Sequence, residues 1–339
     1  MNTTRKMANQ LTALVLCVAG VLTASADETW LGGSGSFLDK TMWSGGAVPI
    51  SGDIATIGDG EALLDDSTMA TQTIAELRVG TNQLTKGAFI LANGALKANY
   101  IRQGFGNGSW GDITQSNGLI QITSTWSDPA LGIGHYPTNG VVAGTTSTYY
   151  MAGGTFDNGT GGNVHVGRYG NGHLVQTGGS ILTHQCWFSI GRFATGVGVY
   201  DLSGGLYYDD NALAGGRSVI VGEEGKGTLN VSGTGRFQTN GGLLLGNGGA
   251  TLSGNGEIYV RFIGDRSGDS AARLAVNGGT IGTFGAGVYE NFLPALTGGV
   301  TIGNNGVTFD ITDANAVTVA AALLAADGAD AGSLTKKGT

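Results

Sequence analysis

The chain has 339 residues, of which 64 are glycine, 12% are charged and 41% are hydrophobic. Collagen is excluded because the glycines do not recur at every third position, and general disorder is excluded because the hydrophobic fraction is that of a globular protein. The formal net charge of −8 argues against nucleic acid as a partner. The composition therefore predicts a folded, turn-rich, all-β protein.

Residues 1–26 have the pattern of a secretory signal peptide. Arg5 and Lys6 precede an apolar run, Leu11–Leu22, that is too short to span a bilayer, and small residues follow at the expected cleavage site. We therefore expect an exported chain that starts at Asp27, with a net charge of −10 and Cys186 as its one cysteine. Such a chain has no internal disulfide, so repetitive packing must stabilise it.

Residues 27–73 do not follow the repeat that comes after them. They contain Trp30, Trp43 and Pro49, which are bulky or rigid and suit the closed end of a core. A stack of strands exposes unpaired backbone groups at both ends, and such ends aggregate unless they are covered. We therefore expect an N-terminal cap and a first irregular coil in this segment.

A first short phrase, apolar–x–apolar–Gly, recurs through residues 74–310. Successive copies are 24, 30, 33, 24, 31, 24 and 18 residues apart. They end at Gly80, Gly104, Gly134, Gly167, Gly191, Gly222, Gly246 and Gly264. A period near 24 residues is that of a solenoid, and glycine suits corners where the chain turns with positive φ. We expect these glycines, from Gly80 to Gly246, to stack along one edge, one per coil.

A second phrase alternates with the first, and it is a short strand of alternating polarity that follows a turn. The positions that we expect to face inward are Ile113, Tyr149, Leu174, Tyr200, Leu229, Ala250 and Leu274, and two residues later Gln115, Met151, Gln176, Leu202, Val231, Leu252 and Val276. Period two indicates strands rather than helices. The sequence thus predicts a parallel β-helix of about eight coils with a repeat of about 24 residues, whereas a β-sandwich or a propeller fits this period less well.

Candidate catalytic and metal-binding residues are few. Asp209 and Asp210 are adjacent, as are Asp65 and Asp66, and neighbouring strand residues point to opposite faces, so neither pair suits a two-carboxylate hydrolase. His184 and Cys186 share a strand face, and His165 or His173 from a neighbouring coil would add a ligand, but a metal site needs three or four. We predict no catalytic activity, no metal and no cofactor.

Aromatic residues of the middle coils are the one pattern suggestive of a ligand. Outward rings stacked along a β-helix would form a strip for sugars, whereas inward rings would fill the core. The candidate glycan contacts are Tyr149, Tyr150, Trp187, Tyr207 and Tyr208.

Three segments resemble a known group of bacterial proteins. The opening "TW…MWSGGAVPISGDIATIG" and the repeats of the type "VGxxGxGxLxxSGG" are similar to secreted autotransporter-like and PEP-CTERM-bearing proteins. The ending "GSLTKKGT" (Gly332–Thr339) resembles the start of the autotransporter-associated β-strand repeat, so residues 311–339 are expected to begin a further, truncated repeat.

The resemblance implies a right-handed β-helix exported to the cell surface or the medium, and no particular chemistry. It implies a structural or adhesin-like passenger, a rigid stalk that presents loops, anchored to the membrane only through a C-terminal segment beyond Thr339. Its expected partners are an extracellular polysaccharide or a host or neighbouring cell surface. The alternative is a carbohydrate-binding or polysaccharide-degrading β-helix protein.

Overall fold

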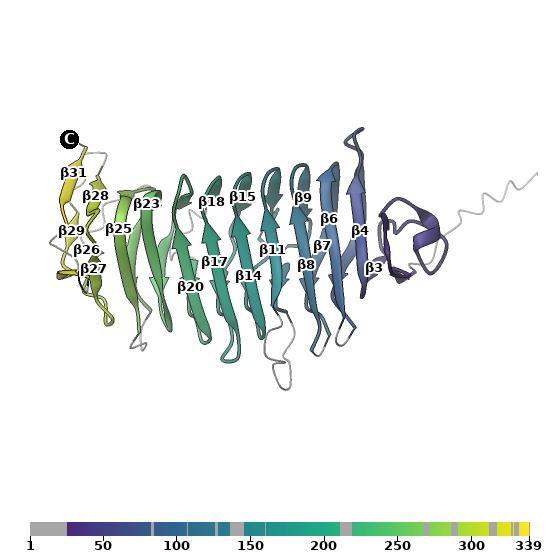
Figure 1. Cartoon of the computed structure of the whole chain (residues 1–339), viewed down its shortest axis with the longest axis horizontal. Helices are drawn as coiled ribbons and strands as arrows, with labels where there is room; N and C mark the ends of the chain where they lie inside the picture. Colours follow the sequence, from purple (N-terminus) through teal and green to yellow (C-terminus); the bar gives the residue numbers. More distant parts are fainter. Residues whose placement is uncertain are drawn as a thin grey trace, which may run out of the picture.

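The computed structural model describes residues 26–82, 85–106, 108–125, 128–135, 146–159, 161–210, 219–266, 271–285, 291–311, 317–326, 328 and 332–338. The expected signal peptide lies outside the described residues, apart from Ala26. The described strands wind into one elongated parallel β-solenoid, with the N-terminal coils at one end and the C-terminal coils at the other (Figure 1). An all-β solenoid is therefore confirmed, and the parallel pairing of every strand excludes a sandwich or a propeller of antiparallel strands.

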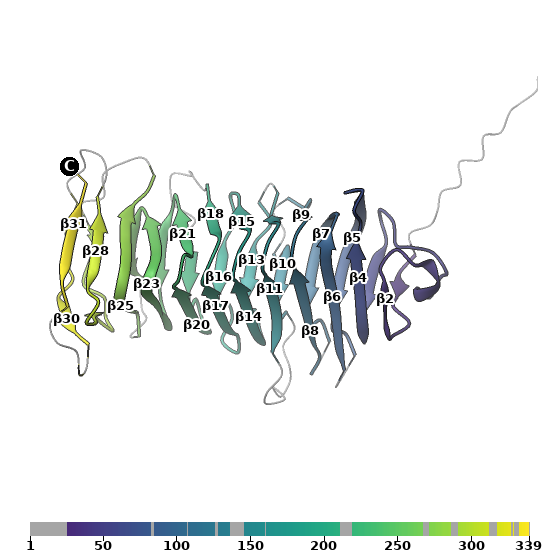
Figure 2. The same ribbon diagram turned by 45° about the horizontal axis from the view of Figure 1, so that its top comes forward.

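The middle coils pass through three parallel sheets, and Figure 2 labels one strand of each in β14 (Asn171–Gln176), β15 (Ser180–Thr183) and β16 (Phe188–Ile190). Sheet 1 contains β2 (Ser34–Ser36), β4 (Gly60–Asp65), β6 (Lys86–Asn93), β8 (Trp110–Gln115), β11 (Ser147–Met151), β14 (Asn171–Gln176), β17 (Val197–Leu202), β20 (Lys226–Val231), the first halves of β23 (Gly248–Val260) and β25 (Arg273–Thr283), β27 (Val300–Ile302) and β30 (Leu323–Ala325).

Sheet 2 follows after a tight turn. It contains the first halves of β5 (Thr71–Val79) and β7 (Ala95–Gln103), β9 (Leu119–Ile122), β12 (Thr155–Asp157), β15 (Ser180–Thr183), β18 (Leu206–Asp209), β21 (Arg236–Thr239), the second halves of β23 and β25, β28 (Val307–Asp310) and β31 (Leu334–Lys337).

Sheet 3 completes the coil. It contains β1 (Glu28–Thr29), β3 (Ile54–Ile57), the second halves of β5 and β7, β10 (Leu131–Ile133), β13 (Val164–Val166), β16 (Phe188–Ile190), β19 (Val219–Val221), β22 (Gly242–Leu245) and β24 (Phe262–Asp265). Two further strands, β26 (Asn291–Leu293) and β29 (Thr318–Val319), form a separate parallel pair.

The inward face of sheet 1 is the one that the alternation predicts. Tyr149 pairs with Leu174, which in turn pairs with Tyr200 and then Leu229 on successive coils. All of the predicted inward residues are buried, and Leu229 and Val231 have no exposed surface. The alternation therefore identifies the core correctly, including the two buried glutamines.

The predicted glycine stack is also confirmed. The residues before Gly80, Gly104, Gly134, Gly167, Gly191, Gly222 and Gly246 are register partners along sheet 3. The first six of these glycines have φ between 65° and 76°, the left-handed region that side chains other than glycine rarely adopt. Gly264 does not continue the stack, because it pairs with Leu244, two positions before Gly246.

The solenoid has about eleven coils, so the predicted number of about eight is wrong. The predicted number rests on the copies of the phrase from Gly80 to Gly264. Two further copies, Ala55–Gly58 at β3 and Val300–Gly303 at β27, were left out. The strands of the outer coils, β3, β4, β27 and β30, pair in parallel within the same sheets. At about 4.8 Å per coil, the stack is about 50 Å long.

Aromatic rings close the N-terminal end of the core. Trp43 packs edge-on against Trp30 and Phe37, with ring centroids 5.1 and 5.0 Å apart, and its indole N–H donates to the carbonyl of Phe37 at 2.8 Å. The chain between β2 and β3, residues 37–53, takes the place that a sheet 2 strand has in the later coils. Within the described residues its 3-10 turn, η1 (Lys40–Met42), is the one helical element, and no helix is long and apolar enough to span a bilayer.

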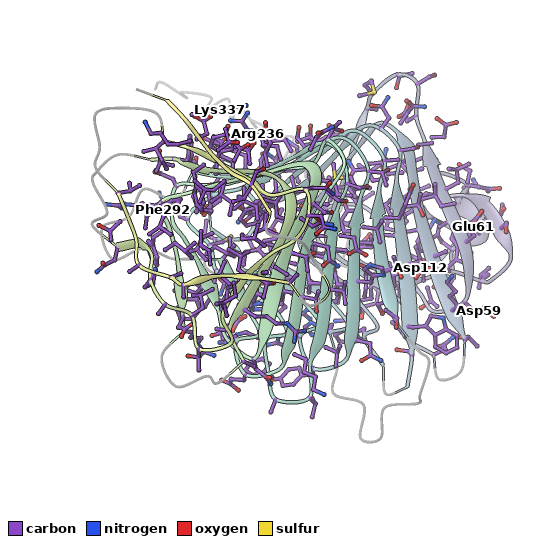
Figure 3. All side chains as sticks on the ribbon, turned by 60° about the vertical axis from the view of Figure 1, so that its left-hand side comes forward. Asp59, Glu61, Asp112, Arg236, Phe292 and Lys337 are labelled. Atoms are coloured by element: carbon purple, nitrogen blue, oxygen red, sulfur yellow. The ribbon has the colours of Figure 1, made fainter. Side chains whose placement is uncertain are left out.

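The C-terminal end of the core is less well covered than the N-terminal end. Figure 3 shows Phe292 near this end and Lys337 at its outer edge, beyond Arg236 on the same sheet. Phe292 is buried, whereas every residue from Ser333 to Gly338 is exposed, and Leu334 keeps 57% of its surface in solvent. β31 nevertheless pairs in parallel with β28, so the backbone of this segment extends sheet 2 by one rung.

Candidate functional site

The five aromatic residues proposed as glycan contacts do not form a strip. Tyr149 and Tyr207 are 1% and 0% exposed, so these two predictions are wrong, because both rings fill the core. Tyr150 lies outward on sheet 1, Tyr208 outward on sheet 2 and Trp187 just before β16 on sheet 3. Since these three face different sides of the solenoid, one ligand cannot contact all of them.

The buried tyrosines are paired with the buried glutamines. The hydroxyls of Tyr149 and Tyr200 donate to the Oε1 atoms of Gln115 and Gln176, both at 2.5 Å. Each glutamine Nε2 donates to backbone carbonyls of the turn into sheet 2, as Gln176 does to Gly179 at 3.2 Å. Burial raises the pKa of both phenols, so they remain neutral donors that anchor the corner.

The adjacent aspartates point to opposite sides, as strand geometry requires. Asp209 is 3% exposed and accepts from the Thr239 hydroxyl at 2.7 Å inside the coil, whereas Asp210 lies outside. In the other pair, Asp65 accepts from Asn93 and Asp66 from Thr68. Neither pair places two carboxylates around a common space.

The residues considered as metal ligands lie apart. His173 is on sheet 1 beside Asp201, at 2.6 Å, and His165 is buried under the outer surface of sheet 3 beside Asp128. Cys186 is buried, while His184 faces outward at the corner between sheets 2 and 3. Among the described residues no group of three or more His, Cys, Asp or Glu side chains has the geometry of a metal site.

The structure does bring His184 and Asp210 together with a third residue, Asp157. Nδ1 of His184 lies 2.7 Å from Oδ2 of Asp210, and its Nε2 lies 3.5 Å from Oδ1 of Asp157. The three residues come from consecutive coils, at the ends of β12, β15 and β18. They line an open depression with Gln121, Gly159 and Gln185, which we call the corner depression.

The backbone at the corner depression is tightly held. The amide of His184 donates to Oδ1 of Asn158 at 2.6 Å, and the Nδ2 of this buried asparagine donates to the carbonyls of Gly162 and His184. Gln185 follows with φ +46°, one of two non-glycine residues with positive φ among the described residues. Such strain persists only where the surrounding structure enforces it.

A second feature that sequence reasoning missed covers the outer face of sheet 3. Residues that follow several of the stacked glycines pack beside Arg78 and Arg102, which lie on β5 and β7 two residues before their own glycines, and together they form what we call the arginine–aromatic layer. It contains Arg78, Arg102, Phe105, His135, Arg168, Tyr169, Arg192, Phe193 and Glu223. The Tyr169 and Phe193 rings stack 4.2 Å apart, and the guanidinium of Arg192 lies 4.7 Å from the Phe193 ring. The sequence signal was the planar or charged residue directly after five of the stacked glycines, from Gly104 to Gly222.

The layer buries polar groups that face outward from sheet 3. Glu223 is 5% exposed, and its carboxylate accepts from the Ser189 hydroxyl at 2.6 Å and pairs with Arg192. Ionic groups with these partners remain tolerable when buried, since hydrogen bonds offset part of their desolvation cost. The outer surface of sheet 3 is therefore a second packed layer rather than a free binding face.

Burial perturbs the titration of the layer. Desolvation, followed by the charges of Arg168 and Arg102, lowers the pKa of His135 to about 3. Burial also lowers the pKa of His165, and the hydrogen bond from His165 lowers the pKa of Asp128 to about 2. The folded protein thus holds both histidines neutral at pH 7.

Acid is expected to destabilise the fold through these two histidines. The pKa of each histidine is lower in the folded state than the unfolded-state pKa of about 6.5. Its contribution to the free energy of unfolding is therefore complete above about pH 6.5 and declines as the pH falls below it. Each histidine loses at most about 1.4 kcal/mol per pH unit, and for His135 the loss ends near pH 3. Asp128 adds a loss only as the pH falls from about 4 through about 2.

Thermal unfolding between pH 7 and pH 3 measures this dependence. The melting temperature should fall with acidification, and His135→Gln, which cannot bind the proton, should give a shallower fall. If the melting temperature depends on pH in the same way in the variant and the parent, the lowered pKa of His135 is contradicted.

The fold and its surface define a class: a glycine-cornered parallel β-solenoid with an aromatic N-terminal cap, a charged outer layer on one sheet and a polar depression at one corner. Comparison of the chain with protein-family models, with curated proteins and with solved structures finds no match.

Proposed function

We propose that the protein is an exported structural or adhesin-like passenger whose solenoid is a rigid stalk that presents corner loops. The observation that carries this proposal is one uninterrupted hydrophobic core that runs through about eleven coils and three parallel sheets. Each coil is paired with both neighbours, so the stack resists bending as a unit. We take the coil to be right-handed and the protein to have no catalytic activity of its own.

Location and partners follow from the sequence. The signal-like residues 1–26 support export to the cell surface or the medium, and the similarity of residues 332–339 to an autotransporter-associated repeat supports anchoring through a further segment. The net negative charge disfavours nucleic acid as a partner. The partner that we propose is an extracellular polysaccharide or a host or neighbouring cell surface. The corner loops are the natural contact points, because loops vary without disturbing the stack. The long spacing that ends at Gly167 predicts loops of extra length at about Asn139–Ser147 and Asn158–Gly162, of which residues 139–145 and 160 lie outside the described residues.

Export and shape test the proposal together. The full chain expressed in a Gram-negative host should be recovered outside the cytoplasm with an N-terminus at Asp27, read by mass spectrometry, and should scatter X-rays as a rod about 50 Å long. A variant with Leu14→Arg, which interrupts the apolar run, should stay in the cytoplasm uncleaved. Parent protein that remains uncleaved in the cytoplasm would refute export, and a compact particle would refute the stalk.

A further inference from the structure

The corner depression carries groups whose arrangement the stalk does not require. A stable corner needs only satisfied backbone groups, yet here three titratable side chains from consecutive coils converge at the surface. Asn158 is fully buried and holds the backbone of His184, and Gln185 keeps a strained backbone beside it. Preorganised polar groups in a concave place are the usual mark of a ligand site.

The lining of the depression is rich in acceptors. Nδ1 of His184 faces the Asp210 carboxylate at 2.7 Å, and its Nε2 faces Oδ1 of Asp157 at 3.5 Å. The Asp157 carboxylate is an acceptor that the amide of Gly159 holds in place at 2.7 Å and the Nε2 of Gln121 at 3.0 Å. Among the described residues that line the depression, none is a lysine or an arginine. The Asp157 carboxylate needs a donor as its partner, and the two carboxylates disfavour acidic sugars.

We propose that the corner depression binds a neutral sugar unit, with two neighbouring hydroxyls hydrogen-bonded to Nε2 of His184 and to the carboxylate of Asp157. Two polar groups 3.5 Å apart match a vicinal diol, and a sugar hydroxyl can either donate to or accept from the imidazole nitrogen. The cavity volume of about 560 Å³ is within the range of about 300–1,000 Å³ that small-molecule sites occupy. This inference goes beyond the stalk and does not require it.

Binding to purified full-length protein tests the site. Isothermal titration calorimetry with mannohexaose, cellohexaose, xylohexaose and galactohexaose provides the neutral probes, with hexagalacturonate as the acidic and chitosan hexamer as the cationic comparison. We expect saturable binding of at least one neutral hexaose and weaker binding of hexagalacturonate, because the carboxylates of Asp157 and Asp210 repel its carboxylates.

The chain offers a matched control for the variants. His173 forms the same kind of pair with Asp201, at 2.6 Å and with similar exposure, on sheet 1, away from the corner depression. His184→Ala and Asp157→Asn should each weaken binding at least tenfold, whereas His173→Ala should change it less than twofold. Circular dichroism melting curves establish that each variant is folded, and Asp210→Asn, which removes the charge that orients His184, replaces any variant that is not.

Four results would overturn the proposal. The first is the absence of saturable binding for every neutral hexaose, and the second is tighter binding of hexagalacturonate than of any neutral hexaose. The third is binding of the chitosan hexamer alone, and the fourth is an equal loss of affinity in the His184 and His173 variants. None of these results bears on export or rod shape, so failure here and failure of the stalk are distinguishable.

Discussion

Replacing Gly198 by alanine is expected to disrupt the solenoid, although the change adds a single methyl group. A Cβ at this position would overlap the carbonyl oxygen of Val166 and stand 2.5 Å from the amide nitrogen of Gly191, both of them backbone atoms that cannot rotate away. Coils would have to separate locally, so we expect a loss of more than about 3 kcal/mol in the free energy of unfolding. Urea unfolding measures this loss, and the yield of soluble protein gives a second readout.

Gly264→Ala is the matched control for this change. Gly264 ends the last copy of the phrase that we counted, but a Cβ there would lie at least 3.6 Å from its nearest neighbours, an ordinary contact. We expect a change within about 1 kcal/mol there. Similar losses in the two variants would show that glycine content rather than the approach of adjacent coils determines stability.

Leu229→Ala is expected to cost about 2–5 kcal/mol, because the truncated side chain leaves a cavity in a core that cannot collapse around it. Leu229 has no exposed surface and lies between Tyr200 and Ala250 on the neighbouring coils. Shifts of the urea midpoint at constant slope would give the value.

The neighbouring outward residue provides the comparison. Thr228→Ala alters the solvent side of the same strand, and we expect less than about 1 kcal/mol there. A Leu229 variant as stable as the Thr228 variant would mean that the inward face of sheet 1 is assigned incorrectly.

Local pattern was sufficient for the repeated part of the fold. Alternation along each strand identified Leu174, Leu202 and Val276 as core residues, and the apolar–x–apolar–Gly phrase located one corner of most coils. Both signals depend on backbone geometry within a few residues, which is the same in every coil. The count of coils fell short in part because two further copies of the phrase, ending at Gly58 and Gly303, were left out.

The aromatic and ionisable residues were less predictable. Tyr149 and Tyr150 are adjacent and of one residue type, yet one fills the core and the other is 39% exposed. Asp157, His184 and Asp210 are separated by more than twenty residues at each step, and nothing in the local sequence relates them. Their meeting depends on the register between coils, which the lengths of the intervening corners determine.

The amino-acid sequence by itself determined that this protein is an all-β solenoid with glycine at its corners, because strand alternation and positive φ are local requirements that each coil meets separately. Only the tertiary structure decided what lies on the surface: the arginine–aromatic layer over sheet 3 and the corner depression around His184. Stacking at about 4.8 Å turns residues that are distant in sequence into neighbours, and these neighbours set burial, charge pairing and pKa.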